Sequence, residues 1–203
     1  MIELPKALFE TALPGLGRAL SGREGRQASN YLKTLIKWQK TQRLVGSTKL
    51  PWLVENVIVD SLLFLAALPQ TARTVADLGS GAGIPGIMLA IVRPEVTFEL
   101  IESRQKRVSF LSSVVRELEL SNVRVTGERA EALVPSRSDA FDAIVMRCAG
   151  DLGDLVDIAT SMLRAGGVLI VSGKPGDKGD VVVERSGKRR TFRVIPRPPT
   201  MTP

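Results

Sequence analysis

The chain has 203 residues, of which 44% are hydrophobic and 24% charged, as expected for a globular domain with room for a sizeable core. It has no histidine and one cysteine, Cys148, which excludes Ser-His-Asp and Cys-His nucleophiles, an intrachain disulfide and a cysteine-based zinc cluster, so we predict no metal site. The formal net charge of +7 favours a polyanionic partner, usually nucleic acid or an anionic membrane.

Residues 1–70 are predicted to form a small helical cap. Prolines and glycines interrupt residues 1–26, which should form short helical pieces joined by turns. Apolar residues recur at helical spacing over residues 27–43, with lysines among them, and a second helix is expected over residues 51–68. The longest apolar run, Leu62 to Leu68, is too short to span a bilayer, and no signal peptide is visible. We therefore expect a cytoplasmic protein with no membrane attachment.

Residues 71–203 alternate short apolar strands with helices, and we treat them as one compact domain. We predict strands at 74–78, 96–101, 123–125, 141–146 and 168–172, helices at 84–92, 104–118 and 152–163, and a loop at 128–138. This alternation is typical of α/β proteins with a doubly wound, mostly parallel sheet. The tail should form an antiparallel hairpin at the sheet edge, from strands at 180–184 and 191–195, because the connection before it is too short for a parallel crossover.

A glycine-rich segment, Asp77-Leu78-Gly79-Ser80-Gly81-Ala82-Gly83-Ile84-Pro85-Gly86, joins the first strand to the following helix. Glycines there let the backbone approach a ligand closely, and the helix N-terminus supplies free N–H donors. The segment also satisfies the Gly-x-Gly-x-x-Gly dinucleotide pattern, which is weak evidence when taken alone. We predict a nucleotide-type cofactor site on this turn.

Two carboxylates favour S-adenosylmethionine as that cofactor. Asp77 stands at the end of the first strand, where a negative charge suits a cationic amino-acid ligand and would repel a pyrophosphate. Glu102 closes the second strand, where it could accept hydrogen bonds from both ribose hydroxyls of an adenosine. NAD sites also use an acidic residue at this place, so Glu102 supports an adenosine without choosing the cofactor.

The same segment closely resembles the cofactor loop of the GidB-type methyltransferases, the bacterial enzymes that methylate N7 of a guanine in 16S ribosomal RNA. Further matches cover about residues 30–175 and include Glu102-Ser103, Arg129-Ala130-Glu131, Arg147-Cys148-Ala149 and Lys174. The Gly-x-Pro-Gly ending of the loop, combined with Arg-Ala-Glu and the later arginine, is far more specific than a bare glycine motif.

The resemblance implies a Rossmann-like class I methyltransferase that binds S-adenosyl-L-methionine. By position, Gly79 and Ile84 would line the cofactor, Ala130 and Glu131 would contact its adenine end, and Arg147 would lie beside it at the fourth strand. The predicted cofactor-binding residues are then Asp77, Gly79, Gly81, Gly83, Ile84, Glu102, Ala130, Glu131 and Arg147. No catalytic base is assigned.

The chain departs from the family pattern at two places in the cap. Arg43-Leu44-Val45 stands where the family usually has Asn-Leu-Thr, and Val57 replaces a histidine shortly before Asp60-Ser61-Leu62. The region after Lys174 is also shorter than expected. These changes leave the predicted cofactor site intact and put substrate binding in doubt.

Methylation of guanine N7 is compatible with the absence of histidine. N7 has an in-plane lone pair and no proton, so its attack on a sulfonium methyl needs no general base, and alignment is the main task of the protein. Basic clusters fit an RNA target: one at Arg104, Lys106 and Arg107, one at Lys33, Lys37 and Lys40, and six Lys/Arg residues in the tail from 185 to 197. The expected partner is 16S ribosomal RNA or the small ribosomal subunit, and we expect a monomer.

Three alternatives stay open. A methyltransferase of the same fold could act on a small molecule, because fold does not determine substrate. A diverged member of the family could bind the cofactor or RNA without turnover. The glycine turn could also bind NAD.

Overall fold

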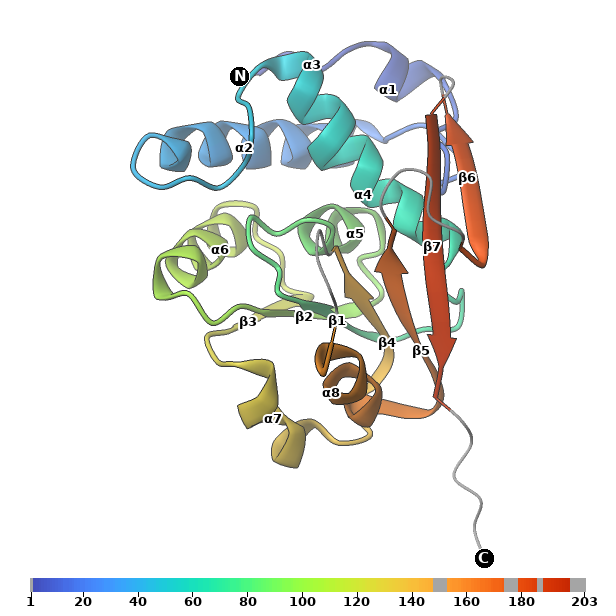
Figure 1. Ribbon diagram of the computed structural model, residues 1–203. Helices are drawn as coiled ribbons and strands as arrows, with labels where there is room; N and C mark the ends of the chain where they lie inside the picture. The colour runs from blue at the N-terminus through green and yellow to red at the C-terminus, as the bar shows by residue number, and fades with distance from the viewer. Residues whose placement is uncertain (1, 148–152, 174–178, 186–187, 198–203) are drawn as a thin grey trace, which may run out of the picture.

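The computed structural model describes residues 2–147, 153–173, 179–185 and 188–197. In this part of the chain, seven strands form one sheet in the order β3-β2-β1-β4-β5-β7-β6 (Figure 1). Strands β1 to β5 are parallel, and β7 pairs antiparallel with both β5 and β6. The bounds are β1 Thr74–Leu78, β2 Thr97–Ile101, β3 Val123–Thr126, β4 Phe141–Met146, β5 Leu163–Ser172, β6 Val181–Arg185 and β7 Lys188–Pro196. The predicted doubly wound, mostly parallel α/β sheet is confirmed.

The strand order reverses direction between β1 and β4. From β1 the chain adds β2 and β3 on one side, and it then returns to place β4 and β5 on the other. In doubly wound sheets ligands bind beyond the carboxyl ends of the strands at such a switch point. The predicted glycine turn follows β1 and therefore lies at this position.

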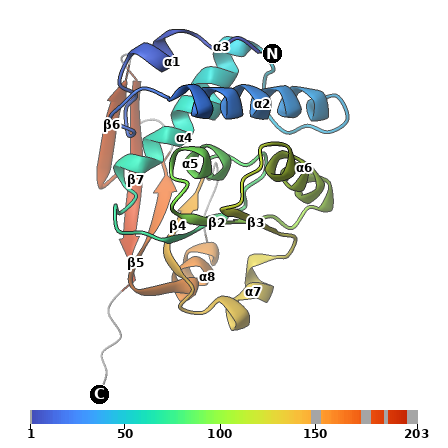
Figure 2. The same cartoon turned by 180° about the vertical axis from the view of Figure 1, so that it is seen from behind.

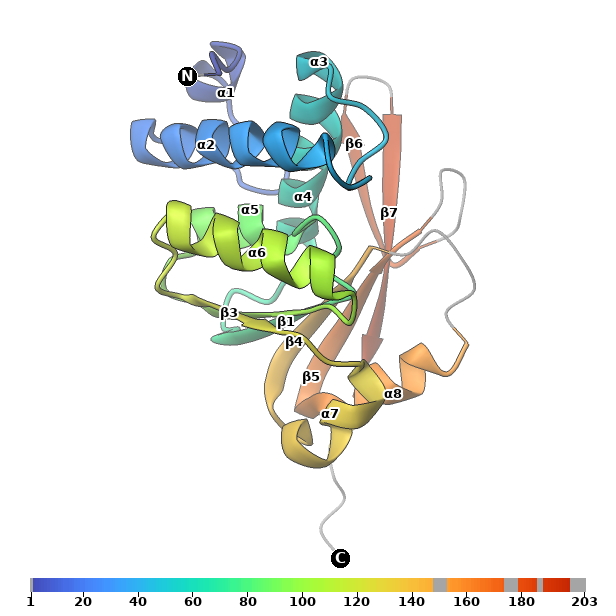
Figure 3. The same ribbon diagram turned by 90° about the vertical axis from the view of Figure 1, so that its left-hand side faces the viewer.

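Helices cover both faces of the sheet, and the N-terminal helices add a further layer on one side. Figure 3 shows α5 and α6 on one face and α7 and α8 on the other, with α2 lying over α5 and α6. Figure 2 shows the same layers from behind. The bounds are α1 Ala7–Glu10, α2 Gly22–Gln39, α3 Leu50–Leu53, the π-helix η1 Val54–Val59, α4 Asp60–Leu62, the 3-10 helix η2 Leu63–Ala66, α5 Gly86–Val92, α6 Gln105–Glu117, α7 Ala130–Arg137 and α8 Leu155–Met162.

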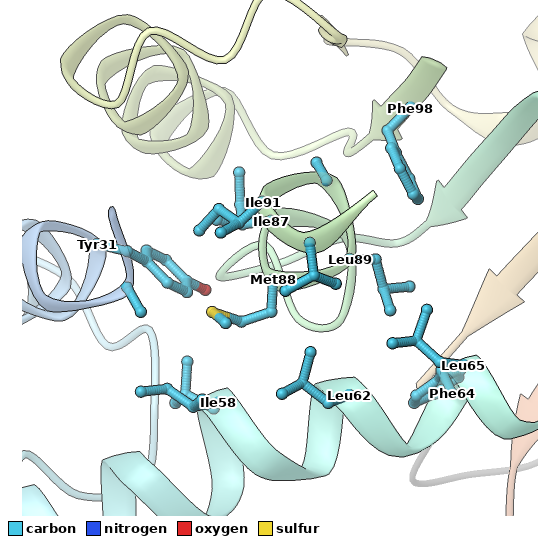
Figure 4. Close-up of a cluster of buried hydrophobic side chains, with 14 of the residues drawn as sticks. Tyr31, Ile58, Leu62, Phe64, Leu65, Ile87, Met88, Leu89, Ile91 and Phe98 are labelled. Carbon is cyan, nitrogen blue, oxygen red and sulfur yellow. The ribbon is translucent and has the colours of Figure 1, made fainter. Parts of the chain in front are cut away.

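The main core lies between the N-terminal helices and α5. The helical elements from Leu50 to Ala66 are hereafter called the second helical segment. Figure 4 shows Tyr31 of α2, Ile58 and Leu62 of this segment, and Ile87 and Met88 of α5 converging on one cluster. All five side chains are fully buried, and burial of each contributes roughly 1.5–3 kcal/mol. The same cluster continues to the sheet, so residues before 70 share their core with the rest of the chain. The division into a cap (1–70) and a methyltransferase domain (71–203) stays a proposal.

Helix α2 begins at Gly22, five residues before its predicted start. The Ser21 side chain accepts the Glu24 N–H, and the Glu24 carboxylate accepts the Ser21 N–H, a capping box that stabilises this end. A Cβ on Gly25 would lie 2.1 Å from the ring of Phe9, so a larger residue here would displace this partly exposed side chain. Gly22 and Gly25 therefore lie inside a helix, whereas Gly15 and Gly17 lie in the predicted turns.

The second predicted helix is one continuous helical segment from Leu50 to Ala66, but its winding changes along its length. It starts as an α-helix, becomes a π-helix over Val54–Val59 and ends as a 3-10 helix. π-turns of this kind occur frequently at functional sites.

The predicted loop at 128–138 is wrong for most of its length. Residues 130–137 form helix α7 rather than a loop, although Pro135 lies inside it, because Ala130 and Leu133 are buried against the second core cluster. Arg137 also binds Glu99 of β2 with Nε 3.1 Å from Oε2, which fixes the end of α7 to the sheet. These tertiary contacts override a local sequence that favours a loop.

Strand β5 begins at Leu163, so the predicted strand start at residue 168 is also wrong. Leu163 pairs with Phe141, and the register then shifts before Val168 pairs with Ala143. The glycine pair Gly166-Gly167 lies inside this irregular part of the strand, where glycine is common at bulges. The predicted hairpin at the sheet edge is confirmed by β6 and β7.

None of the helices in the described ranges is long and apolar enough to cross a membrane.

Gly15 provides a test of how the N-terminal turn packs on the second helical segment. Its φ is +82°, and a Cβ there would lie 2.1 Å from the main-chain oxygen of Leu62, whereas Gly17, at φ +73°, has no atom within 4 Å of that position. Gly17→Ala should cost only the left-handed strain, about 1–2 kcal/mol. Gly15→Ala should cost about 1–3 kcal/mol more, because the backbone must move. Urea unfolding measures both values, and equal losses would contradict this packing.

Candidate functional site

The carboxyl ends of the parallel strands surround a cavity of about 390 Å³. Its lining comes from the ends of β1, β2 and β4, from the turn between β3 and α7, and from the start of α8. The lining residues are Leu78, Gly79, Ile101, Glu102, Ser103, Glu128, Arg129, Ala130, Glu131, Met146, Arg147 and Leu155. Hereafter this cavity is called the crevice.

Five of the nine predicted site residues line the crevice: Gly79, Glu102, Ala130, Glu131 and Arg147. The other four, Asp77, Gly81, Gly83 and Ile84, belong to the turn behind it and are not part of the lining. The lining brings together residues from five separate segments that are up to 77 positions apart in the chain, from Leu78 to Leu155.

The sequence reasoning missed seven lining residues. Leu78, Ile101 and Met146 are the last residues of β1, β2 and β4, so the rule that ligands bind at the carboxyl ends of parallel strands could have found them. Ser103 and Arg129 are direct neighbours of predicted residues, and Glu128 stands two positions before Ala130. Leu155, at the start of α8, carries no signal in the sequence.

The glycine turn is a network of short main-chain bonds. The N–H groups of Gly79 and Ser80 donate to the Ile101 carbonyl at 2.9 and 3.1 Å, and the Gly83 N–H donates to the Ser80 carbonyl at 2.7 Å. Gly79 has a φ of +74°, and no atom lies within 4 Å of the position that a Cβ would take. Gly79 thus leaves open space at the crevice.

Gly83 and Gly86 serve packing. A Cβ on Gly83 would lie 2.5 Å from Cγ1 of Ile87, and one on Gly86 would lie 2.4 Å from Cδ2 of Leu100. A side chain at Gly86 would clash with the sheet, because α5 passes close to it here, and a side chain at Gly83 would clash with Ile87 of α5 and Leu111 of α6. The glycine pattern of the sequence is thus shared between ligand space and helix packing.

Tyr31 holds the turn from the side away from the crevice. Its hydroxyl donates to the Ala82 carbonyl at 2.5 Å, and its side chain is fully buried. Burial raises the pKa of this hydroxyl far above its ordinary value, so the proton that makes the bond is retained. Helix α2 thereby fixes the position of the glycine turn.

Glu102 connects the glycine turn to the start of α6. Its Oε2 accepts the Gly81 N–H at 3.0 Å, its Oε1 accepts the Arg104 N–H at 2.8 Å, and Nη1 of Arg107 lies 3.5 Å from Oε2. Oε2 thus has two donors and Oε1 has one, so Oε1 keeps a lone pair that can accept a further bond from a ligand in the crevice.

Asp77 is buried directly behind the turn. Its Oδ2 accepts the Gly86 N–H at 2.9 Å, whereas its Oδ1 is buried without a hydrogen-bond partner among the described residues. Burial raises the pKa of Asp77 to about 7, against the opposing effects of the Gly86 N–H and the charge on Arg147.

Arg147 reaches the crevice from the end of β4 and is held by the second helical segment. Its Nη1 donates to the Asn56 carbonyl at 2.9 Å, and its Nη2 lies 3.1 Å from Oδ2 of Asp60. Cys148, Ala149 and Lys174, which also carried the sequence resemblance, lie outside the described residues.

The charges of the lining suit a cationic ligand that also carries hydroxyl groups. Three carboxylates, Glu102, Glu128 and Glu131, face two guanidinium groups, Arg129 and Arg147. A diphosphate would be repelled by this set, and an anion site needs converging N–H donors. In the described part of the chain, no cluster of three His, Cys, Asp or Glu side chains could hold a metal ion.

Basic side chains lie on α6, whose start follows the lining residue Ser103, and on α2, which packs against α6. Helices α2 and α6 pack side by side with opposite directions, because Trp38 contacts the ring of Phe110 and the Gln27 amide reaches the Leu118 carbonyl. The two predicted basic clusters here are Lys33, Lys37 and Lys40 at α2, and Arg104, Lys106 and Arg107 at the start of α6. Five of these six side chains are exposed, whereas Arg107 is half-buried and forms an ion pair with Glu102. In the tail, by contrast, Arg190 and Arg197 form ion pairs with Asp60 and Asp139.

The two departures in the cap have clear positions. Leu44 and Val45 donate their N–H groups to the Gln39 side chain, so the segment that replaces Asn-Leu-Thr is tied to the end of α2. Val57 is fully buried in the main core, and at this position the chain contributes packing rather than a polar group.

Comparison with known proteins identifies relatives for most of the chain. The family model described as rRNA small subunit methyltransferase G, GidB, matches residues 24–187. The protein of Xanthomonas euvesicatoria pv. vesicatoria named ribosomal RNA small subunit methyltransferase G is 39% identical over 141 residues, which are 69% of this chain and 64% of that protein. The protein of the same name from Laribacter hongkongensis is 35% identical, over 80% of this chain and 76% of that protein. The chain thus spans less than two thirds of the length of the Xanthomonas relative.

A solved structure supports the fold. The crystal structure of a SAM dependent methyltransferase from Aquifex aeolicus superimposes with a TM-score of 0.55 at 18% identity, covering 79% of this chain and 97% of that one. The Rossmann-like methyltransferase fold predicted from the sequence is thereby confirmed.

Asp77 gives the site a measurable dependence of stability on pH. Its pKa is higher in the folded chain than in the unfolded one, so its contribution to stability is complete below about pH 4 and is lost as the pH rises through about 7. The expected loss is on the order of 1.4 kcal/mol for each unit by which the pKa is raised. Asp77→Asn should remove this part of the pH dependence of the free energy of unfolding, measured in urea without ligand.

Asp142→Asn is the matched control. Burial acts to raise the pKa of Asp142, but the N–H groups of Arg73 and Thr74 keep it below its ordinary value. Its contribution is therefore lost as the pH falls below about 4, and the variant should keep the slope between pH 4 and 7. If Asp77→Asn keeps the wild-type slope of the unfolding free energy between pH 4 and 7, the raised pKa does not belong to Asp77.

Proposed function

The chain belongs to the GidB family, the rRNA small subunit methyltransferases G, and from this membership we propose that it transfers a methyl group from S-adenosyl-L-methionine to N7 of a guanine in 16S ribosomal RNA. The proposal is carried by the overlap between the family match and the lining of the crevice. The family match, residues 24–187, contains every residue that lines the crevice.

The crevice fits S-adenosylmethionine in three respects. Oε1 of Glu102 has a lone pair for a ribose hydroxyl, Ala130 and Glu131 offer a contact for the adenine end, and the glycine turn leaves space at Gly79. The lining has one carboxylate more than it has guanidinium groups, which favours a sulfonium over the diphosphate of NAD. Asp77, Gly81, Gly83 and Ile84 would act from the turn behind, by holding its shape.

When bound, S-adenosylmethionine supplies an electrophilic methyl group on a positively charged sulfur. The chain's own residues have a positioning task, because guanine N7 attacks through a lone pair and gives up no proton. The apolar lining of Leu78, Ile101, Met146 and Leu155 would exclude water from the crevice. In such a site the fixed carboxylates and guanidinium groups act more strongly on a migrating charge than they would in water.

An RNA partner accounts for the exposed basic side chains on α2 and at the start of α6. Such groups bind phosphates without reading sequence, and those at the start of α6 directly follow the lining residue Ser103. N7 of a guanine lies in the deep major groove of A-form RNA, so the target base should be unpaired or distorted. We further propose that the protein acts in the cytoplasm as a monomer.

Methyl transfer can be tested directly with small ribosomal subunits that lack this modification. Incubation with S-adenosylmethionine labelled on the methyl group should place the label in 7-methylguanosine of the 16S RNA, identified by nucleoside analysis. Because phosphate contacts dominate, RNA affinity should fall steeply as the salt concentration rises.

The outcomes of this experiment separate the alternatives. Tight binding of the cofactor without labelled RNA would support a non-catalytic member of the family. Label in a small molecule from a cell extract, with none in RNA, would support a small-molecule methyltransferase. Binding of NAD in place of S-adenosylmethionine in a parallel titration would refute the cofactor assignment.

Gly79→Ala tests whether the open space at the turn belongs to the cofactor. Gly166 is a matched control, because both glycines have a positive φ, +74° and +77°, and neither has an atom within 4 Å of a Cβ position, but Gly166 does not line the crevice. Both variants should lose about 1–2 kcal/mol of stability. Only Gly79→Ala should weaken S-adenosylmethionine binding in calorimetry, by about tenfold or more, because its methyl group overfills the site. Equal affinities of the two variants would place the cofactor elsewhere.

A further inference from the structure

Asp60 binds two arginines that come from different parts of the sheet. Its carboxylate is buried, with 9% of the side chain exposed. Nη2 of Arg147, at the end of β4, lies 3.1 Å from Oδ2, and Nε of Arg190, in β7, donates to Oδ1 at 2.7 Å. The second helical segment, β4 and β7 therefore meet at one negative charge.

The winding of the helix prepares a second contact for Arg147. In an α-helix the Asp60 N–H would donate to the Asn56 carbonyl, but in this π-turn it donates to the carbonyl of Glu55. The Asn56 carbonyl instead accepts a bond from Nη1 of Arg147 at 2.9 Å. Asn56 and Asp60 are four residues apart and share one face of the helix, so a single guanidinium reaches both.

Two contacts on a planar guanidinium determine more than its position. The Asn56 carbonyl and the Asp60 carboxylate bind different nitrogens of Arg147, which fixes the plane of the group as well as its place. An arginine side chain otherwise has many rotamers, and ordering it costs conformational entropy. Arg147 is thus held in one orientation where it lines the crevice.

We propose that Asp60 is a positioning residue for cofactor binding, which acts by holding the Arg147 guanidinium at the crevice. The inference rests on the proposed function, because it assigns Arg147 a role toward S-adenosylmethionine. Arg190 balances the charge of Asp60 from the opposite side and has no direct part in the crevice, whose lining does not include it. Asp60 would thereby connect the N-terminal helices to ligand affinity without touching the ligand.

A double-mutant cycle tests this coupling. Calorimetry with S-adenosylmethionine is carried out on the wild type, Asp60→Asn, Arg147→Ala and the double variant. Each single variant should bind about tenfold more weakly, and the double variant should be no weaker than Arg147→Ala, because residues in direct contact are not additive. A loss of about a hundredfold in the double variant, or wild-type affinity in Asp60→Asn, would overturn the proposal.

Arg190→Ala is the matched control, since it removes the other partner of Asp60 and leaves Arg147 in place. It should lower the urea midpoint and keep S-adenosylmethionine affinity within about twofold of the wild type, because only Arg147 lines the crevice. A tenfold loss of affinity in this variant would show that any damage to the cluster weakens binding, and would overturn the specific role of Asp60.

If Asp60→Asn fails to fold, Asp60→Glu carries the test. This variant keeps the charge but moves the carboxylate by one methylene. It should weaken S-adenosylmethionine binding when Arg147 is present and have no further effect when it is combined with Arg147→Ala. An equal loss in both backgrounds would overturn the proposal. Failure of the wild type to bind S-adenosylmethionine would count against the proposed function itself, whereas normal binding by the wild type and by Asp60→Asn would refute only the role of Asp60.

Discussion

The parallel pairing of β1 with β2 on one side and β4 on the other is the constraint on which the crevice depends. Asp77 of β1 lies level with Leu100 of β2 and with Val145 of β4, so the three strands end together. Their last residues, and those that follow, must then converge, although they come from distant parts of the sequence. The connection that follows β1 leads to β2 on one side, and the connection that follows β4 leads to β5 on the other. The turns after β1 and β4 therefore diverge, which leaves room for a ligand between them.

The N-terminal helices support this site as well as covering it. Tyr31 of α2 binds the Ala82 carbonyl in the glycine turn, and the second helical segment holds Arg147 through Asn56 and Asp60. These contacts come from the same layer that shares its core with α5. A change in the packing of the N-terminal helices would therefore be transmitted to two sides of the crevice.

Charges are separated between the crevice and the surface beside it. Carboxylates exceed guanidinium groups in the lining of the crevice, although the whole chain carries a net charge of +7. Exposed lysines and arginines lie on α2 and at the start of α6. Such an arrangement lets one molecule bind a cationic small ligand inside and a polyanion outside, because each field acts mainly over short distances in salt.

The sequence by itself determined the fold class, the place of the glycine turn and the absence of any base chemistry that needs histidine. These features are local: alternating strand and helix periods, glycines at a strand end, and residue types that are simply missing. Five of the nine predicted site residues line the crevice. Glu102 was placed by the predicted end of the second strand and Gly79 by the glycine turn, whereas Ala130, Glu131 and Arg147 came from the family resemblance.

Only the tertiary structure decided which glycine borders the crevice and where the helices form. Gly79 borders open space while Gly83 and Gly86 pack against neighbouring side chains, a distinction set by the approach of α5 and not by the glycine motif. Helix α7 forms in spite of Pro135, because Ala130 and Leu133 are buried and Arg137 binds Glu99. The joint hold of Asp60 on Arg147 and Arg190 likewise joins positions up to 130 residues apart, which no local pattern encodes, since it arises from the packing of three separate elements.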